Sequence, residues 1–275
     1  MPRKTKKGGN NEYNIYDEIQ KRSEIKGTDG SQYVKFNLHA NESIITLPGS
    51  LITMNSGIEK AELNFDGITS GLKKLLAGES FLYQKFTGNG NNGILLLGSN
   101  FINSVIAMKI YTGNDFRLSR YSFLACTDNI KIDMTTQSRG IIGFGQEEGF
   151  FLPTAKCVSG NYGYIWLSTF GSFEKIDVPA NEHLIVDNGM FLACNNNYNY
   201  TITKLGKSLF SSWLGGEGFG MKFQGPSTIF IQTKNINEFL MQLGYGGGNS
   251  SSSDNIAVDA GKGAVKGILE GIFGN

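Results

Sequence analysis

The sequence predicts an all-β fold: a duplicated sandwich of antiparallel strands, with a flexible arm before it and a short helix after it. A repeated pattern is the first reason. Residues 78–90 open on a Gly-Glu pair, continue as an alternating apolar segment and end in a glycine-rich turn, and residues 215–227 repeat this pattern. Each copy leads into an apolar run, and a weaker middle copy spans residues 148–167. Repetition at this scale is typical of an architecture built from duplicated β-units.

A second repeated signature supports the duplication. The segment Phe-Leu-Ala-Cys occurs at residues 123–126 and again at residues 191–194. Each copy precedes a polar turn and then an alternating strand, at 130–134 and at 198–202. Strict alternation over this length predicts strands with one face in the core and the other in water.

Composition is consistent with such a fold and excludes some functions. The chain of 275 residues is 40% hydrophobic, and its 37 glycines and 5 prolines suit tight hairpins and bulges. A net charge of +1 argues against a dedicated nucleic-acid binder, which needs a basic stripe to displace counterions from phosphate, so we expect no specific nucleic-acid partner. No run of 18 apolar residues occurs, and we expect no transmembrane insertion.

The cysteines and the N-terminus bear on the compartment. Three cysteines, Cys126, Cys157 and Cys194, make no disulfide framework, and an odd number without a signal peptide indicates an intracellular, reducing compartment. We interpret them as small buried hydrophobic side chains, with a reactive thiol as the alternative. Residues 1–11 carry four basic residues and no acidic one, without the apolar face of a clear mitochondrial presequence. A nuclear-localisation or phosphate-contacting arm is the alternative to a merely solvated one.

The pattern divides the chain into four parts. We expect a basic flexible arm at 1–30, with at most one short turn of helix at Tyr16–Ile25, and the duplicated sandwich body at 31–243. A Gly/Ser linker follows at 244–253, and an amphipathic tail at 254–275.

Strands begin near residue 33. Residues 33–38 alternate cleanly, and 44–47 and 51–54 are the next two strands. Between them, Pro48 and Gly49 have the chemistry of a type II turn, because proline presets the first φ and glycine accepts a positive φ at the second position. From residue 81 to residue 233 short strands follow one another, which favours a sandwich or barrel.

Two helices are expected near the C-terminus. Residues 235–243 have helical periodicity. In the tail, an apolar stripe would form on one helix face, made of Val265, Ile268, Leu269, Ile272 and Phe273. Glycines at every fourth position weaken this helix, so we expect it to order on contact with its own oligomer or another protein. Disorder and binding to a membrane interface are the alternatives.

These landmarks together resemble the altered inheritance of mitochondria protein 24 family over about residues 33–240. Each matching piece is weak alone, but their order and spacing are fairly specific. The pieces are Leu47-Pro48-Gly49-Ser50, Gly78-Glu79-Ser80-Phe81, Ser122-Phe123-Leu124-Ala125, Val186-Asp187-Asn188-Gly189, Gly215-Gly216-Glu217-Gly218 and Ile231-Gln232-Thr233.

The resemblance implies a body of duplicated halves, similar to the fold of the tryptophan RNA-binding attenuation protein, and a compact homotrimer. It implies no catalytic residues, and it links the eukaryotic mitochondrial member to membrane organisation in that organelle. The chain departs from the family at two turns, 88–90 and 225–227, where the family favours Gly-Pro-Gly. Its asparagine clusters hint at an AT-rich coding genome, as in a protist or a large DNA virus.

The candidate site residues have mainly structural interpretations. Glu79 and Glu217 hold equivalent places in two repeats, where each is expected to accept backbone N–H bonds at a turn; a carboxylate pair across a shared site is the alternative. Asp187 is expected to cap a turn. Phe210 and Trp213 lie together before a glycine pair and are candidate interface anchors.

Motifs for catalysis and for cofactor or metal binding are weak. His39 and His183 have no second ligand type at metal spacing, and we interpret both as surface or edge residues. Residues 143–149 superficially resemble a glycine-rich nucleotide loop but lack the following helix and lysine.

We therefore expect a non-enzymatic structural or scaffold protein, without metal or cofactor, that organises a larger assembly or membrane-associated complex. It would interact with itself, and with another protein through its tail. A mitochondrial or virion address, the latter as a structural component of a large DNA virus, and a small-molecule or nucleic-acid binding module are the alternatives.

Overall fold

The computed structural model describes residues 15–63, 83–90, 92–119, 121–133, 152–195, 200–204 and 219–243. Within these ranges the fold is a series of antiparallel sheets with few helices, which confirms the predicted all-β class. The predicted linker and tail lie outside the described residues.

Three consecutive units of six strands make up the described body. The first unit contains β2 (Tyr33–Leu38), β3 (Ser43–Thr46), β4 (Leu51–Met54), β5 (Ile58–Leu63), β6 (Tyr83–Gly88) and β7 (Gly93–Gly98). The second contains β8 (Asn103–Tyr111), β9 (Phe116–Leu118), β10 (Phe123–Thr127), β11 (Ile130–Asp133), β12 (Thr154–Cys157) and β13 (Tyr162–Phe170). The third contains β14 (Phe173–Val178), β15 (His183–Asp187), β16 (Phe191–Asn195), β17 (Tyr200–Lys204), β18 (Phe219–Gln224) and β19 (Ser227–Gln232).

The same pairing rule holds in each unit. The sixth strand pairs with the first and the third, and the fifth strand pairs with the second and the fourth. The turn between the first and second strands also recurs, with a positive φ at Asn41 (67°), Gly113 (80°) and Asn181 (69°). The body therefore has three units where the resemblance implied two halves, and the described part of the weak middle copy, 152–167, belongs to the second unit.

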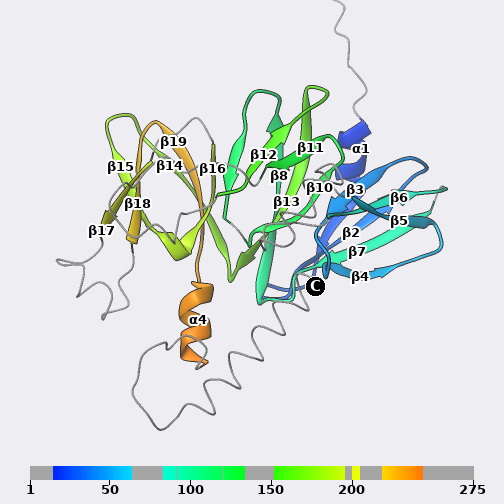
Figure 1. Ribbon diagram of the computed structural model, residues 1–275, viewed down its shortest axis with the longest axis horizontal. Helices are drawn as coiled ribbons and strands as arrows, with labels where there is room; N and C mark the ends of the chain where they lie inside the picture. Colours follow the sequence, from blue (N-terminus) through cyan, green and yellow to red (C-terminus); the bar gives the residue numbers. More distant parts are fainter. Residues whose placement is uncertain are drawn as a thin grey trace, which may run out of the picture.

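Consecutive units share their sheets. The second strand of one unit pairs with the third strand of the next, as β3 does with β10 and β9 with β16. Four sheets result: sheet A (β1-β2-β7-β4, where β1 is Ser23–Lys26), sheet B (β5-β6-β3-β10-β13-β8), sheet C (β11-β12-β9-β16-β19-β14) and sheet D (β15-β18-β17). Figure 1 shows sheet D at the left and sheet A at the right, where strands β5 and β6 of sheet B also lie.

Three apolar clusters fill the spaces between the sheets. One lies between sheets A and B and includes Phe36 and Trp166, the second lies between B and C and includes Ile165, and the third lies between C and D and includes Phe223. Because sheets B and C are covered on both faces, their central strands β10, β13 and β16 are almost entirely buried.

The N-terminal part corrects the predicted arm. Residues 15–30 are not a free arm: α1 (Ile15–Lys21) is followed by β1 (Ser23–Lys26), which pairs with β2. Ile19 of α1 is buried in the cluster between sheets A and B. The helix carries acidic residues in its first turn and Lys21 in its last, which suits the helix dipole. The helix overlaps the short turn expected at 16–25, and because seven residues are too few for a stable isolated helix, tertiary contacts hold it in place.

The helix predicted at 235–243 is confirmed as α4 (Ile236–Gln242). It follows sheet C, and the ring of Phe239 lies 5.3 Å from the ring of Phe170. Gly49 has a φ of 86°, as the predicted turn after Pro48 requires.

Candidate functional site

Most of the predicted site residues lie outside the described part of the chain. The predicted turn, interface and tail roles of eight residues therefore stay predictions: Glu79, Glu217, Phe210, Trp213, Ile268, Leu269, Ile272 and Phe273.

Asp187 lies at the end of β15, before the short 3-10 helix η1 (Asn188–Met190). Its Oδ1 accepts a hydrogen bond of 2.8 Å from the backbone N–H of Gly189, so the side chain caps this turn. The carbonyl of Gly189 in turn accepts from Gln232 Nε2 at 2.9 Å. These contacts give Asp187 a structural role at the junction of β15 with β16.

The cysteines are part of the core. Cys126, Cys157 and Cys194 are buried and free, as expected of small hydrophobic side chains. Burial raises the pKa of Cys126, and it raises the pKa of Cys194 to about 12. Thiols held neutral in this way are poor nucleophiles. His39 and His183 are exposed, and the described residues contain no group of three potential metal ligands.

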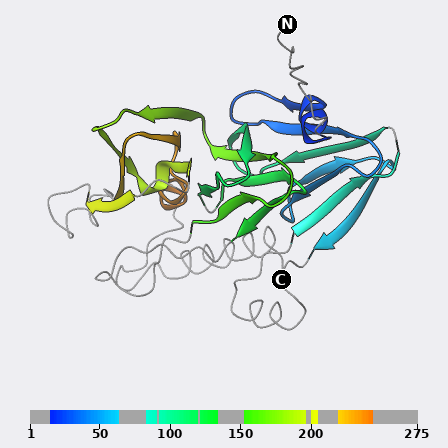
Figure 2. The ribbon, with the colours of Figure 1, turned by 90° about the horizontal axis from the view of Figure 1, so that it is seen from above.

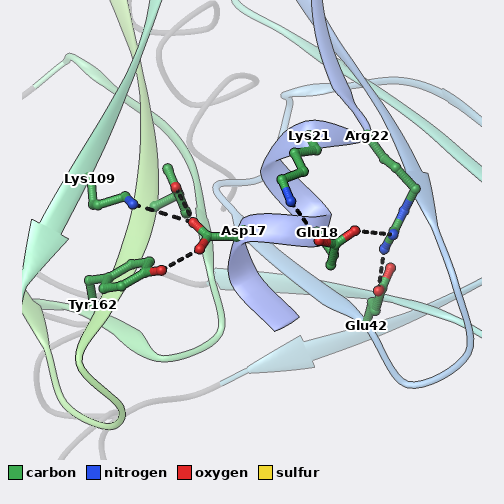
Figure 3. A network of polar contacts seen from close by, with 8 residues as sticks. Asp17, Glu18, Lys21, Arg22, Glu42, Lys109 and Tyr162 are labelled. Carbon is green, nitrogen blue, oxygen red and sulfur yellow. Dashed lines mark hydrogen bonds and ion pairs between the residues drawn. The ribbon is translucent and has the colours of Figure 1, made fainter. Parts of the chain in front are cut away.

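A polar cluster that sequence reasoning missed joins α1 to the second unit (Figure 3). The carboxylate of Asp17 accepts hydrogen bonds from the hydroxyls of Tyr162 and Tyr164, and Lys109 Nζ lies 3.4 Å from its Oδ1. Lys109 also lies 3.9 Å from the centroid of the Tyr162 ring, a cation–π contact. The four residues come from α1, β8 and β13, so no local pattern in the sequence brings them together.

The charges within this cluster stabilise one another. Partial burial acts to raise the pKa of Asp17, but hydrogen bonds from Tyr162, Tyr164 and Lys109 outweigh it and lower that pKa below its usual 3.8. Contact with Tyr164 and with Asp17 raises the pKa of Lys109. Burial and the bond to Asp17 raise the pKa of Tyr164 to about 12. At neutral pH the cluster is therefore an ion pair of Asp17 and Lys109, to which the neutral phenol of Tyr164 donates a hydrogen bond.

A second set of contacts fixes the other side of α1. Arg22 pairs with the buried carboxylate of Glu42 and donates from Nε to the carbonyl of Asn37 at 3.2 Å. Glu42 also accepts from the backbone N–H of His39 at 2.8 Å. Together, the two sets attach α1 to the first and second units, and their role is structural.

We expect Asp17→Asn to lower the free energy of unfolding at pH 7 by about 1–3 kcal/mol, since it removes a carboxylate that accepts charge-assisted hydrogen bonds. The lowered pKa means that this stabilisation is complete above pH 3.8 and is lost as the pH falls through the folded-state value. Urea unfolding followed by circular dichroism between pH 7 and pH 3 measures the difference from wild type, which should shrink at the acid end. Asp29→Asn, at an exposed aspartate, is the control; an equal effect of both substitutions would contradict the assigned role.

The open edges of the two end strands, β4 and β15, are the candidate contact sites. In the described residues, β4 at the edge of sheet A pairs only with β7, and β15 at the edge of sheet D pairs only with β18. Figures 1 and 2 both place these strands at opposite ends of the stack. Their counterparts inside the stack are all paired on both edges. An open edge presents unpaired backbone N–H and C=O groups and is a site for adding a further strand.

The arrangement of strands can be compared with known proteins. The family model described as mitochondrial biogenesis AIM24 matches residues 23–234, from the start of β1 to just beyond β19. The chain belongs to the mitochondrial biogenesis AIM24 family. Membership confirms the resemblance seen in the sequence and indicates a role related to mitochondrial biogenesis.

A solved structure shares the fold of this AIM24 family member. A crystal structure of a protein from Streptococcus pyogenes matches it with a TM-score of 0.65 and 24% identity, over 81% of this chain and 98% of that chain. At this identity the likeness concerns the fold alone. No curated protein matches the chain. The predicted likeness to the attenuation-protein fold stays a prediction. In the described residues, no helix has the length and apolar character needed to cross a membrane.

Proposed function

We propose that this AIM24 family member is a non-enzymatic, oligomeric scaffold that organises a larger assembly at the mitochondrion. One observation carries the proposal: within the described residues, the body is an array of three repeated units, and its end strands β4 and β15 lack the neighbours that their counterparts in the other units have. Repeat arrays of this kind are extended surfaces for contact with other proteins, and their ends need a cap or a partner. The family's link to mitochondrial biogenesis supports the address.

The burial of reactive groups supports a structural role. The cysteines are inside the core, and the charged cluster around Asp17 is closed on itself by internal hydrogen bonds. These groups stabilise the fold. The proposed homotrimer is the oligomer that the family resemblance implies.

Quantitative mass spectrometry can test the scaffold role. The chain is expressed with a tag in a eukaryotic cell, and mitochondria and native complexes are isolated. A scaffold is a stoichiometric component, so its ratio to its partners should stay constant across preparations. Recovery as a free monomer away from mitochondria would overturn the proposal, and recovery in purified virus particles would overturn the mitochondrial address.

Ending the chain after Leu243 should leave the body folded while weakening its attachment to the larger assembly. All strand pairs of the described body lie between residues 23 and 232, so the described sheets form from residues that precede the linker and tail. Circular dichroism and light scattering should show an unchanged thermal midpoint and oligomer, while less protein is recovered in the native complex.

Two double substitutions distinguish the contribution of the tail's apolar stripe from that of its lysines. The double change Ile268→Lys and Ile272→Lys should act like the truncation, and Lys262→Ala with Lys266→Ala should not. Unfolding of the truncated body would show that the tail is part of the core.

A further inference from the structure

We propose that a second copy of the chain pairs its β4 with the open edge of β15, so that copies join head to tail by the same junction that joins units within one chain. This inference rests on the proposed scaffold function and names its partner and contact. The two edges lie at opposite ends of one molecule, so a chain cannot satisfy both by folding onto itself (Figures 1 and 2).

The internal junctions define the expected contact. In both, the second strand of one unit runs antiparallel to the third strand of the next unit. In the third unit the second strand is β15, and in the first unit the third strand is β4. These are the two strands that the rule leaves without a neighbour in the described chain.

The register of the contact follows from equivalent positions. In the first junction Thr46 faces Ala125 and Ile45 faces Cys126; in the second, Leu118 faces Ala193 and Arg117 faces Cys194. Two features determine which residues are equivalent. The second strands are aligned by the positive-φ turn that precedes each of them, and the third strands by their pairing with the sixth strand of the same unit.

By this correspondence, Val186 of one copy should face Thr53 of the next, and Ile185 should face Met54. All three third strands carry the same register shift against their sixth strand, between Leu51 and Thr53 in β4 and at the equivalent positions of β10 and β16. The edge of β4 therefore already has the shape of the edges that are paired inside the chain.

The exposure of side chains at equivalent positions indicates that β4 and β15 each lack a neighbouring strand. Ile52 of β4 is 55% exposed, while its counterpart Leu124 is 2% exposed. Met54 is 39% exposed, while its counterpart Cys126 is fully buried. On the other edge, Ile185 is 46% exposed, whereas its counterpart Ile45 is 4% exposed.

The strand next to β4, which is β7, shows the same difference in side-chain exposure. Trp166 of β13 is covered by the preceding unit, where the ring of Phe36 lies 4.8 Å from it, and Phe230 of β19 packs in the cluster between sheets B and C. The equivalent residue of β7 is Leu96, which is only partly buried, next to exposed Ile94. A preceding unit from another copy would cover both.

Head-to-tail contacts close into a ring or continue as a filament, depending on the rotation between copies. A ring of three copies would contain nine units and leave neither edge open. The trimer that the sequence resemblance implies is therefore compatible with this junction.

Complementary variants test the junction. Ile52→Lys with Met54→Lys blocks only the β4 edge, and Ile185→Lys with His183→Lys blocks only the β15 edge, since edge lysines oppose strand addition. Each purified full-length variant should be a monomer by light scattering at 50 μM, roughly the concentration at which micromolar contacts form. An equimolar mixture should give a 1:1 dimer and nothing larger, because one intact edge of each kind remains.

Two controls and two outcomes make the test decisive. Val158→Lys and Ile102→Lys change apolar residues of similar exposure away from both edges and should leave the wild-type oligomer intact. A monomeric wild type would overturn this junction and the oligomeric scaffold together. A wild-type oligomer that persists in both edge variants would overturn the junction alone. Circular dichroism excludes variants that fail to fold.

Cysteine cross-linking tests the register. Facing Cα atoms of antiparallel strands lie about 4.5–5.5 Å apart, within the range that a disulfide spans. A chain with Met54→Cys and Ile185→Cys should form covalent multimers under mild oxidation, and one with Ile52→Cys and Ile185→Cys should do so at least tenfold less. Equal yields from both, or no multimers from the first, would overturn the register.

Discussion

Replacing Trp166 with alanine should lower the free energy of unfolding by about 3–5 kcal/mol, the usual cost of removing a large aromatic side chain from a core. Trp166 is fully buried between sheets A and B. Its ring meets Phe36 edge to face at 4.8 Å and lies 6.3 Å from the ring of Tyr164. It therefore joins the first unit to the second.

Trp166→Phe should cost no more than about 1.5 kcal/mol, although it also removes atoms. The indole Nε1 is buried and has no hydrogen-bond acceptor in the described residues, so phenylalanine removes an unpaired donor along with the lost contact area. The third unit already carries a phenylalanine, Phe230, at the equivalent position. Urea unfolding of both variants gives the two values, and an equal loss in both would show that the indole N–H is satisfied.

Replacing Gly88 with alanine should cost about 3 kcal/mol, at the upper end of ordinary point mutations. A Cβ at this position would lie 2.1 Å from the carbonyl oxygen of His39 and 3.1 Å from that of Leu38. Both are backbone atoms, held in place because Gly88 donates to Glu42 at 2.9 Å and accepts from Asn41 at 2.8 Å. The turn between β2 and β3 would have to move.

Gly90→Ala, two residues further on, is the matched control for the Gly88 substitution. A Cβ there would meet nothing within 4 Å, and we expect a change within about 0.5 kcal/mol. Thermal or urea unfolding compares the two variants. A similar cost for both would mean that the lost flexibility of glycine, rather than the close approach of Gly88 to the backbone of His39, explains the Gly88 effect.

Strands with clean alternation could be predicted from the sequence. Residues 33–38 were expected as a strand and form β2, whose burial alternates residue by residue because one face covers the cluster between sheets A and B. The helix at 235–243 was equally evident, since its periodicity is local. These elements are determined by patterns within a few residues of one another.

The number of units could not be predicted in the same way. The Phe-Leu-Ala-Cys signature marks β10 and β16, which are covered on both faces and paired on both edges. The equivalent strand β4 reads Leu51-Ile52-Thr53-Met54, because at the edge of the stack no second sheet requires small buried residues. The Phe-Leu-Ala-Cys signature therefore depends on the environment of a strand as well as on its place in the repeat. The first unit lacks the signature, because its equivalent strand β4 lies at the edge of the stack.

The attachment of α1 also escaped prediction. Asp17 meets Tyr162 and Tyr164 across a sequence separation of 145 and 147 residues. Arg22 meets Glu42 after 20 residues. No local sequence pattern indicates that residues so far apart in the sequence will be in contact. The basic run before the helix instead indicated a solvated arm.

The sharing of sheets between units has a consequence for synthesis of the chain. The open edge of β3 pairs with β10, and the hydroxyl of Thr46 donates to the carbonyl of Leu124, 78 residues later. During synthesis, the edge of β3 in the first unit stays unpaired until β10, which ends at Thr127, has left the ribosome. The second unit waits in the same way for β16. Non-local pairing of this kind slows folding and leaves strand edges exposed to incorrect pairing, so we expect folding of the nascent protein to benefit from chaperones.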